Sequence, residues 1–307
     1  MTDASLSQTR STNPFAGLMS GTVGPVTVVV LAIIALWYVA AVALNAPFQQ
    51  DMYERAGQND IGFAQLVTDT LYQERPVLPA PHQVIVEIWD TTVNKKITSK
   101  RSLVYHTGIT LSSTLLGFLI GTTLGILLAI GIVHSRVLDK SLMPWVISSQ
   151  TIPILAIAPM IIVVLNAVGI SGLLPKAMIS TYLSFFPVTV GMVKGLRSPE
   201  VIHMDLMHTY SATRFQAFWK LRLPYAVPYL FTSMKIGMAA SLVGAIVGEL
   251  PTGAVAGLGA RLLAGSYYGQ TVQIWSALLM AAFLAGSLVA LIGIIEKRTL
   301  KRMGMAG

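Results

Sequence analysis

The sequence contains no cysteine and very little charge. The absence of cysteine excludes disulfide bonds, thiolate zinc sites, iron–sulfur clusters and cysteine nucleophiles. Charged residues make up 11% of the 307 residues, compared with about 25% in soluble proteins, whereas hydrophobic residues make up 54%. So few charges cannot cover a soluble globule of this length. We therefore expect lipid to surround most of the chain.

The sequence also lacks the short motifs of several common enzyme classes. It has no Gly-x4-Gly-Lys-Ser/Thr motif, so the chain is not expected to hydrolyse ATP by the P-loop route. Gly-x-Ser-x-Gly is absent, and the five histidines show no spacing typical of metal ligands. These absences predict a chain that is not an enzyme and that holds no metal or cofactor of its own.

Long stretches without Asp, Glu, Lys or Arg indicate where the chain crosses a membrane. A span needs about 20 mostly apolar residues, and a charge at the bilayer centre costs about 2.5–3.5 kcal/mol. Lys235, inside the fifth stretch, is interpreted as a lysine that snorkels to the membrane surface. The pattern predicts an all-α integral membrane protein with six transmembrane helices, at residues 22–44, 107–133, 144–167, 173–193, 228–249 and 273–295.

The first apolar stretch has a second interpretation as a cleaved signal peptide, because Ala41-Val42-Ala43 resembles a cleavage site. Its apolar part is longer than the roughly 7–15 residues of a signal-peptide core, and the residues before it are not basic. We therefore favour an uncleaved anchor.

The distribution of Lys and Arg predicts the orientation. With a cytoplasmic N-terminus, the segments 1–23, 134–143, 194–226 and 296–307 lie inside and hold 12 of the 21 basic residues but only five of the 13 acidic ones. This agrees with the positive-inside rule, so the net charge of +8 needs no nucleic-acid partner. The exception is the basic cluster Lys95, Lys96, Lys100 and Arg101, which this topology places outside in a long loop.

The segments outside the spans follow from this topology. Residues 1–21 are rich in Ser, Thr, Asn and Gly, which predicts a disordered cytoplasmic N-terminus. Residues 45–106 form an external segment, in which His82 to Thr92 predicts a short amphipathic helix. Residues 107–295 form the transmembrane core, and residues 296–307 a cytoplasmic tail.

Glycines and polar residues give the spans their internal features. Gly117, Gly121 and Gly125 share one helix face and predict that another helix approaches closely. Polar patches occur beside a proline kink in the third span and in the fourth span, and an acid ends the fifth. The two patches are explained equally well by a transport pathway or by hydrogen bonds between helices. Glu249 is either a gate or contact residue or, as the favoured alternative, a hydrated interfacial acid or a cap to the amides of the next turn. The candidates for a pathway or gate are Ser148, Ser149, Gln150, Thr151, Ser180, Tyr182, Ser184 and Glu249.

The internal loop 194–226 is expected to be structured. Ser198-Pro199-Glu200 predicts the start of a helix that runs to about Thr209. After a turn at 210–212, Thr213 is expected to cap a second helix, 214–221, that ends before Leu223-Pro224. Its apolar stripe of Phe215, Phe218 and Trp219 either packs on the bundle or fits a groove on a partner.

This loop resembles the EAA loop of the permease subunits of ABC importers. The family pattern is Glu-Ala-Ala, three residues, Gly, and a spacer that ends in Leu-Pro; Asp205 falls at the Glu, Ser211 at the Gly and Leu223-Pro224 at the end. If the family's Gly adopts a left-handed turn, Ser211 costs about 1–2 kcal/mol there. Over residues 78–302 the chain resembles nitrate/sulfonate/taurine/bicarbonate-type permeases, through Leu78-Pro79-x-Pro81, Ile152-Pro153 with Ala158-Pro159, Phe185-Phe186-Pro187, Val247-Gly248-Glu249 and Gly257-Leu258-Gly259.

The resemblance implies a type I ABC importer permease-like bundle with a cytoplasmic coupling helix, in the inner (plasma) membrane of a bacterium with both termini in the cytoplasm. It implies three kinds of partner: ATP-binding cassette subunits that bind ATP and Mg, a periplasmic or extracellular substrate-binding protein, and a second permease copy, identical or related. It assigns contact with the ATPase to Asp205, Met207, Ser211, Arg214, Phe215, Phe218 and Trp219.

The substrate is expected to be a small polar organic solute or an anion such as a sulfonate, nitrate, bicarbonate or a pyrimidine. The spans contain few basic residues, which favours a neutral molecule slightly. The alternative function is a secondary transporter without an ATPase partner, which would need paired ionisable residues within the spans.

Overall fold

The computed structural model describes residues 23–58, 61–251 and 256–305, and every regular element within these ranges is a helix. The predicted disordered segment 1–21 lies outside the described residues. The chain divides into two compact units, Met1–Ile85 and Val86–Gly307. Within the described ranges, five helices are long and apolar enough to cross a membrane, or six if one bent pair forms a single span, in agreement with the predicted all-α membrane protein.

The first unit contains α2 (Val23–Arg55), α3 (Phe63–Leu71) and the start of α4 (Pro81–Trp89). The buried Asn45 of α2 fixes the segment before α4, because its Oδ1 accepts hydrogen bonds from the backbone of Val77 (2.8 Å) and Leu78 (3.1 Å). Its Nδ2 donates to the carbonyl of Leu78 (2.9 Å). The predicted helix at 82–92 is confirmed as α4 and the π-helical turn η1 (Asp90–Asn94), whereas α3 was not predicted.

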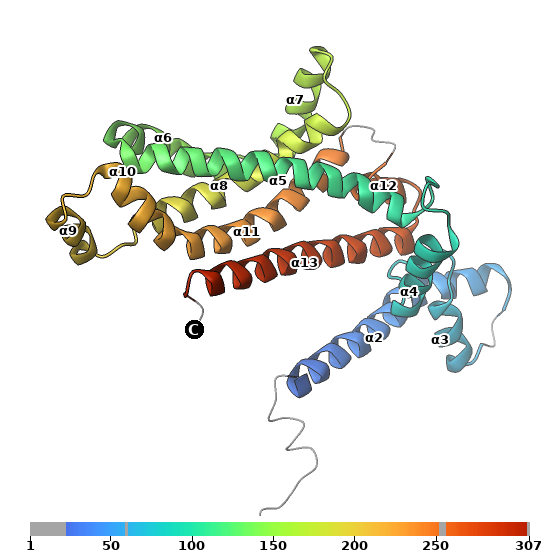
Figure 1. The fold of residues 1–307 in the computed structure, drawn as a ribbon. Coiled ribbons are helices and arrows are strands. Elements are labelled where there is room, and N and C mark those ends of the chain that lie inside the picture. The colour runs from blue at the N-terminus through green and yellow to red at the C-terminus, as the bar shows by residue number, and fades with distance from the viewer. Residues whose placement is uncertain (1–22, 59–60, 252–255, 306–307) are drawn as a thin grey trace, which may run out of the picture. The chain divides into compact units, whose positions relative to one another are not determined.

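The second unit is built around α8 (Leu173–Leu196), which packs along both α5 (Leu103–His134) and α11 (Leu223–Glu249). α13 (Thr271–Arg302) packs against α11 and α5, and α12 (Leu258–Tyr267) packs against α13, α11 and α5 (Figure 1). The apolar core between α5, α11, α12 and α13 includes Leu103, Leu242, Leu258 and Leu284.

The glycine face of α5 lies against α8, as predicted. A Cβ atom at Gly117 would lie 2.6 Å from the carbonyl oxygen of Ala177, and one at Gly125 would lie 2.9 Å from that of Phe185. The two backbones therefore approach so closely that a side chain has no room between them. Thr181 of α8 uses this closeness to donate a hydrogen bond to the Gly117 carbonyl (3.1 Å).

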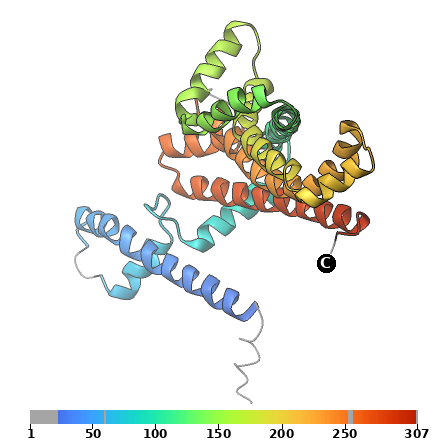
Figure 2. The same ribbon diagram turned by 90° about the vertical axis from the view of Figure 1, so that its left-hand side faces the viewer.

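The third predicted span, 144–167, is sharply bent at the predicted proline kink. The structure has α6 (Arg136–Ser148), the short 3-10 turn η2 (Ser149–Thr151) and α7 (Ile154–Ala167), and the two α-helices meet at 103°. Figures 1 and 2 show α7 pointing away from α5 and α8. Pro153, which has no N–H to donate, precedes the first residue of α7, whereas Pro144 and Pro159 lie inside helices.

Lys235 forms an ion pair with Glu296 of α13, so its charge is neutralised between two helices. The sequence interpretation of Lys235 as a snorkelling lysine omitted this partner. Pairing is the usual solution for a charge within an apolar helix, because an isolated charge there loses its hydration.

We expect Gly117→Ala to destabilise the protein, because the added methyl group collides with the backbone of α8. Overpacking of this kind costs about 1–3 kcal/mol, which lowers the melting temperature of the detergent-solubilised protein by several degrees. Gly286→Ala on α13 is the matched control, since a Cβ there meets nothing within 4 Å. Equal melting temperatures of the two variants would contradict the close packing of α5 and α8.

Candidate functional site

Two groups of side chains stand out in the second unit, at opposite ends of the bundle. One is the helical hairpin, residues 201–222, between α8 and α11. The other is the set of contacts that holds the start of α12 against the start of α5 and the end of α11. Figure 1 shows α9 and α10 at one end of the bundle and α12 at the other.

The hairpin begins with α9 (Val201–Thr209), which starts later than predicted. Its first backbone bonds run from His203 (3.1 Å) and Met204 (3.3 Å) to the carbonyl of Glu200. Ser198 is not the N-cap, because its hydroxyl instead donates to the carbonyl of Gly195 (2.7 Å) at the end of α8. The predicted helix exists, but Ser198-Pro199 belongs to the connection before it.

The turn at Ser211 has the left-handed conformation that the family's glycine would favour, with φ at 51°. The N–H of Ser211 donates to the carbonyl of His208 (2.8 Å), and the N–H of Ala212 donates to that of Met207 (2.9 Å). This pair of bonds is a Schellman motif, in which the left-handed residue directly after the C-cap is usually glycine, because glycine adopts this conformation without strain. Ser211 holds the same conformation at a steric cost.

Thr213 caps the next helix as predicted. Its Oγ1 accepts from the N–H of Gln216 (3.3 Å), and the Gln216 side chain accepts from the N–H of Thr213 (2.9 Å). The helix does not end before Leu223-Pro224, however. α10 (Arg214–Ala217) continues through the π-helical turn η3 (Phe218–Arg222) into α11, and Pro224 lies just after this turn within the continuous helix.

The aromatic stripe of the hairpin faces two ways. Phe218 is 8% exposed and packs with Ile132 and Leu196, whereas Phe215 is 71% and Trp219 52% exposed. One part of the stripe therefore attaches the hairpin to the bundle, and the other part is free for a partner. The interpretation that the stripe packs on the bundle is confirmed for Phe218, whereas the fit to a partner stays a prediction for Phe215 and Trp219.

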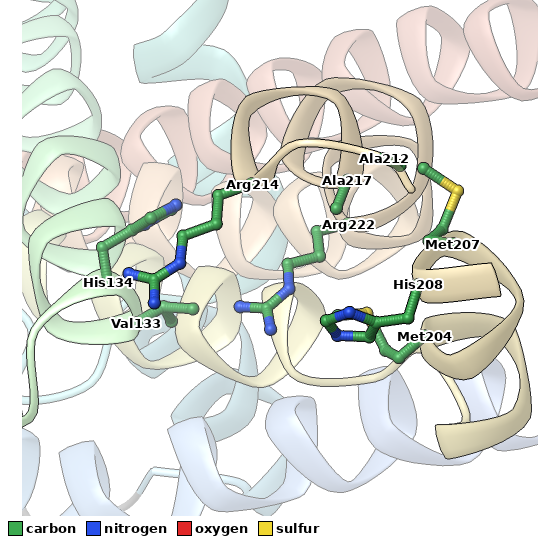
Figure 3. A pocket seen from close by; sticks show the side chains of 9 residues that line it. All are labelled: Val133, His134, Met204, Met207, His208, Ala212, Arg214, Ala217 and Arg222. Carbon is green, nitrogen blue, oxygen red and sulfur yellow. The ribbon is translucent and has the colours of Figure 1, made fainter. Parts of the chain in front are cut away.

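A pocket of about 330 Å³ lies between the hairpin and the end of α5. Arg214 and Arg222 point into it together with His134 and His208, so it carries positive charge (Figure 3). Met207 also lines this pocket. The other residues assigned to ATPase contact lie on the exposed surface of the hairpin, except Phe218: Asp205, Ser211, Phe215 and Trp219.

At the opposite end, three successive backbone N–H groups at the start of α12 are bound by three side chains. Gly257 donates to Nδ1 of His106 (3.0 Å), Leu258 to Oγ1 of Thr110 (2.8 Å), and Gly259 to a carboxylate oxygen of Glu249 (2.8 Å). Thr110 in turn donates to Glu249 (2.9 Å). We call this arrangement the α12 anchor.

The contacts of the α12 anchor determine where the proton of His106 lies and how Glu249 is held. Because Nδ1 of His106 accepts from an amide, the proton of the neutral ring is on Nε2, which donates to the carbonyl of Lys100 (2.9 Å). Glu249 is fully buried, and the buried Lys176 gives it a favourable electrostatic interaction. Gly257 has φ at +131°, and a Cβ there would overlap the Glu249 carboxyl group.

The predicted pathway residues are only partly brought together. Ser180 and Ser184 are fully buried on α8, where they face the glycines of α5. Tyr182 donates to the carbonyl of Ser149 and so ties α8 to the break between α6 and α7. Ser148, Gln150 and Thr151 are exposed on this single chain. Glu249 lies apart from them, in the α12 anchor.

The sequence interpretation missed His106, Thr110 and Arg261. His106 and Thr110 are four residues apart and therefore share one face at the start of an apolar helix. This polar pair could have indicated a contact with another segment. Arg261 of α12 bonds the carbonyl of Arg101 (3.1 Å) and the carboxylate of Glu87 (3.1 Å). Burial lowers the pKa of Arg261, and Glu87 opposes this effect. Among the described residues, no group of three His, Asp or Glu side chains could hold a metal ion.

Replacing Ser211 with glycine should stabilise the hairpin by about 1 kcal/mol, because glycine adopts a positive φ without strain. The neighbouring change Ala212→Gly should have the opposite sign, since Ala212 is not at positive φ and glycine only adds freedom to the unfolded chain. Amide hydrogen exchange of residues 205–217 measures both effects. The same sign for the two variants would argue against a strained turn.

Gly257→Ala should release the start of α12, because its methyl group displaces the Glu249 carboxylate. The chain has no cysteine, so Ala260→Cys provides a single buried reporter thiol. Loosening by about 1.4 kcal/mol would raise its maleimide labelling rate about tenfold. Gly269→Ala is the control: it has φ at +64° but nothing within 4 Å, so it carries strain without a collision. Unchanged labelling in Gly257→Ala would show that Glu249 does not hold α12.

Comparison with known proteins identifies the family of this chain. The family model described as binding-protein-dependent transport system inner membrane component matches residues 121–304. The riboflavin transport system permease protein of Chloroflexus aurantiacus is 31% identical over 72% of this chain and 78% of that protein. The formylaminopyrimidine transport permease protein of Halalkalibacterium halodurans is 30% identical over 60% of this chain and 68% of that protein.

Among solved structures, a chain of an inward-facing methionine ABC transporter is similar with a TM-score of 0.46 and 20% identity, over 72% of this chain and 96% of that chain. The family model and the relatives describe transport subunits, which confirms the predictions of a permease and of a chain that is not an enzyme. The chain belongs to the family of binding-protein-dependent transport system inner membrane components.

Proposed function

We propose that this chain is the membrane permease of an ATP-driven importer of type I, in which a separate ATPase binds ATP and Mg. The observation that carries the proposal is the hairpin: a capped helix–turn–helix that presents Phe215 and Trp219 outward while Phe218 anchors it to the bundle. An apolar, partly basic surface of this kind fits a groove on a partner protein. Membership of a binding-protein-dependent family favours an importer over a secondary transporter.

In the proposed orientation, the hairpin and both chain termini lie in the cytoplasm of a bacterial cell. The support is the excess of Lys and Arg in the segments on that side. The α12 anchor then lies at the external face, where a substrate-binding protein delivers the solute. Two permease copies, identical or related, form the complete transport pathway.

In this function the hairpin transmits movement from the ATPase to the spans. Closing of the ATPase around ATP moves the grooves that hold the two hairpins, and the spans exchange inward-facing for outward-facing arrangements. The apolar side chains Phe215 and Trp219 fill the groove. At the edge of the groove, Asp205 and Arg214 form polar contacts and Ser211 forms the turn. Met207 and Phe218 support the hairpin from inside.

Glu249 acts as part of an external gate through α12. The three hydrogen bonds of the anchor join α12 to both α5 and α11, so a change in the relative position of these two helices must strain or break them. The exposed polar residues Ser148, Gln150 and Thr151, at the break beside Tyr182, are the proposed pathway lining. Ser149, Ser180 and Ser184 border it from the more buried side.

The substrate is a small polar heterocyclic molecule of low charge. The relatives at 30–31% identity are named for riboflavin and formylaminopyrimidine transport. Lys235 is paired with Glu296, so it offers little net charge to an anionic solute. Relatives named for aliphatic sulfonate and nitrate transport are less similar, at 23–24% identity.

The coupling surface is tested with Phe215→Asp in the complete transporter reconstituted with its ATPase and binding protein. A charge at this exposed aromatic position should abolish stimulation of ATP hydrolysis by the binding protein and weaken ATPase association at least tenfold, or about 1.4 kcal/mol. Phe63→Asp is the matched control, because Phe63 is similarly exposed (79% against 71%) and lies far along the chain from the hairpin. Full coupling in Phe215→Asp would reject the assignment.

A further inference from the structure

A polar cavity of about 650 Å³ lies beside the α12 anchor and shares His106 with it. It is enclosed by the end of α4, by η1, by the start of α5, and by α12 with the segment that leads into α13. Its lining is rich in charge, with Lys95, Lys100, Arg101 and Arg261 against Glu87 and Asp90. Three of the four residues in the external basic cluster that the positive-inside rule leaves unexplained therefore line one cavity: Lys95, Lys100 and Arg101.

Two of the four cations are already neutralised. Lys95 pairs with Asp90 (3.2 Å), and Arg261 pairs with Glu87 (3.1 Å). Hydrogen bonds from Asn94 and Lys95 lower the pKa of Asp90, so this acid is ionised. Among the described residues, Lys100 and Arg101 form no ion pair, and both side chains are exposed at the edge of the cavity. The cavity thus has an excess of positive charge.

Arg261 adds an unfilled hydrogen-bond donor. It is only 7% exposed, its two terminal nitrogens are bound to Arg101 and Glu87, and its Nε has no partner among the described residues. A buried donor without a partner costs about 1–3 kcal/mol, more for a charged group. A carboxylate is the natural acceptor for a guanidinium, since it accepts charge-assisted hydrogen bonds.

The surroundings fit a protein partner better than a free solute. Tyr268 lines the cavity and is 71% exposed, and its neighbour Tyr267 is 80% exposed. Exposed tyrosines next to arginines, around a desolvated centre, are typical of protein interfaces. A transported solute would instead be expected near the bilayer midplane, and this cavity lies at the end of the bundle opposite the hairpin.

We propose that this cavity receives an acidic side chain, Asp or Glu, from the external substrate-binding protein. The proposal rests on the proposed function, because it assigns the docking surface of that importer. The carboxylate is held between Arg261, Lys100 and Arg101. Because Arg261 belongs to α12 and His106 lines the same cavity, the docked partner acts directly on the helix that the α12 anchor secures.

The test uses the complete transporter in nanodiscs, with the binding protein added at increasing concentration and ATP hydrolysis measured. Lys100→Glu and Arg101→Glu should each raise the half-saturating concentration of binding protein about tenfold and weaken its dependence on salt. Lys96→Glu is the matched control, because Lys96 is exposed in the same loop but does not line the cavity, and it should stay within about twofold of the unchanged protein. An Asp or Glu to Lys change at the docking residue of the binding protein should restore binding to Lys100→Glu.

Equal effects of Lys96→Glu and Lys100→Glu, or no effect of either, would overturn the cavity assignment while leaving the importer function in place. Inhibition by inorganic sulfate that Lys100→Glu removes, with unchanged affinity for the binding protein, would assign the cavity to a free anion and also overturn it. If the unchanged transporter shows no stimulation by any binding protein, the proposed function itself fails, and the docking site fails with it.

Discussion

Helices in a bilayer cannot be held together by the hydrophobic effect, since lipid tails are as apolar as the side chains they replace. In the second unit of this protein, close contact between helix backbones holds the helices together. The glycines at 117, 121 and 125 bring α5 onto α8, and Gly244 brings α11 close to Ser180 on the same helix. Ser241 of α11 donates to the Thr114 carbonyl of α5 (2.9 Å), a bond that only such closeness allows. The hairpin and the α12 anchor are both attached to these three helices.

The α12 anchor shows how the same principle is extended to the end of the bundle. The first N–H groups of any helix lack partners within the helix, and in a buried position they must be bound by something else. Here His106 and Thr110 come from α5 and Glu249 from α11, so one helix start depends on two others. A buried acid is costly alone, but Thr110 and Gly259 bind both of its oxygens.

Much of this arrangement follows from local patterns in the sequence, and the rest depends on contacts across long sequence separations. The glycine face of α5 was predictable because helical spacing alone puts its members in line. The turn at Ser211 was predictable from its register in the hairpin pattern. The kink beside the polar residues 148–151 was predictable from Pro153, whereas its angle of 103° is not fixed by any local pattern. The α12 anchor joins Thr110 to residue 249, and nothing near either residue reveals the other.

The absence of a break before Pro224 has a structural consequence. Residues 214–249 form one continuous helical segment of 36 residues, which includes the π-helical turn η3 and Pro228. One tip of this segment carries Arg214 and Phe215, and the other tip carries Glu249. Because the helix has no break, the hairpin and Glu249 are joined through one continuous backbone, and the π-helical turn and the two prolines are the positions where such a helix kinks. A single turn of π-helix, where a break was expected, thus joins the two surfaces through the same helix.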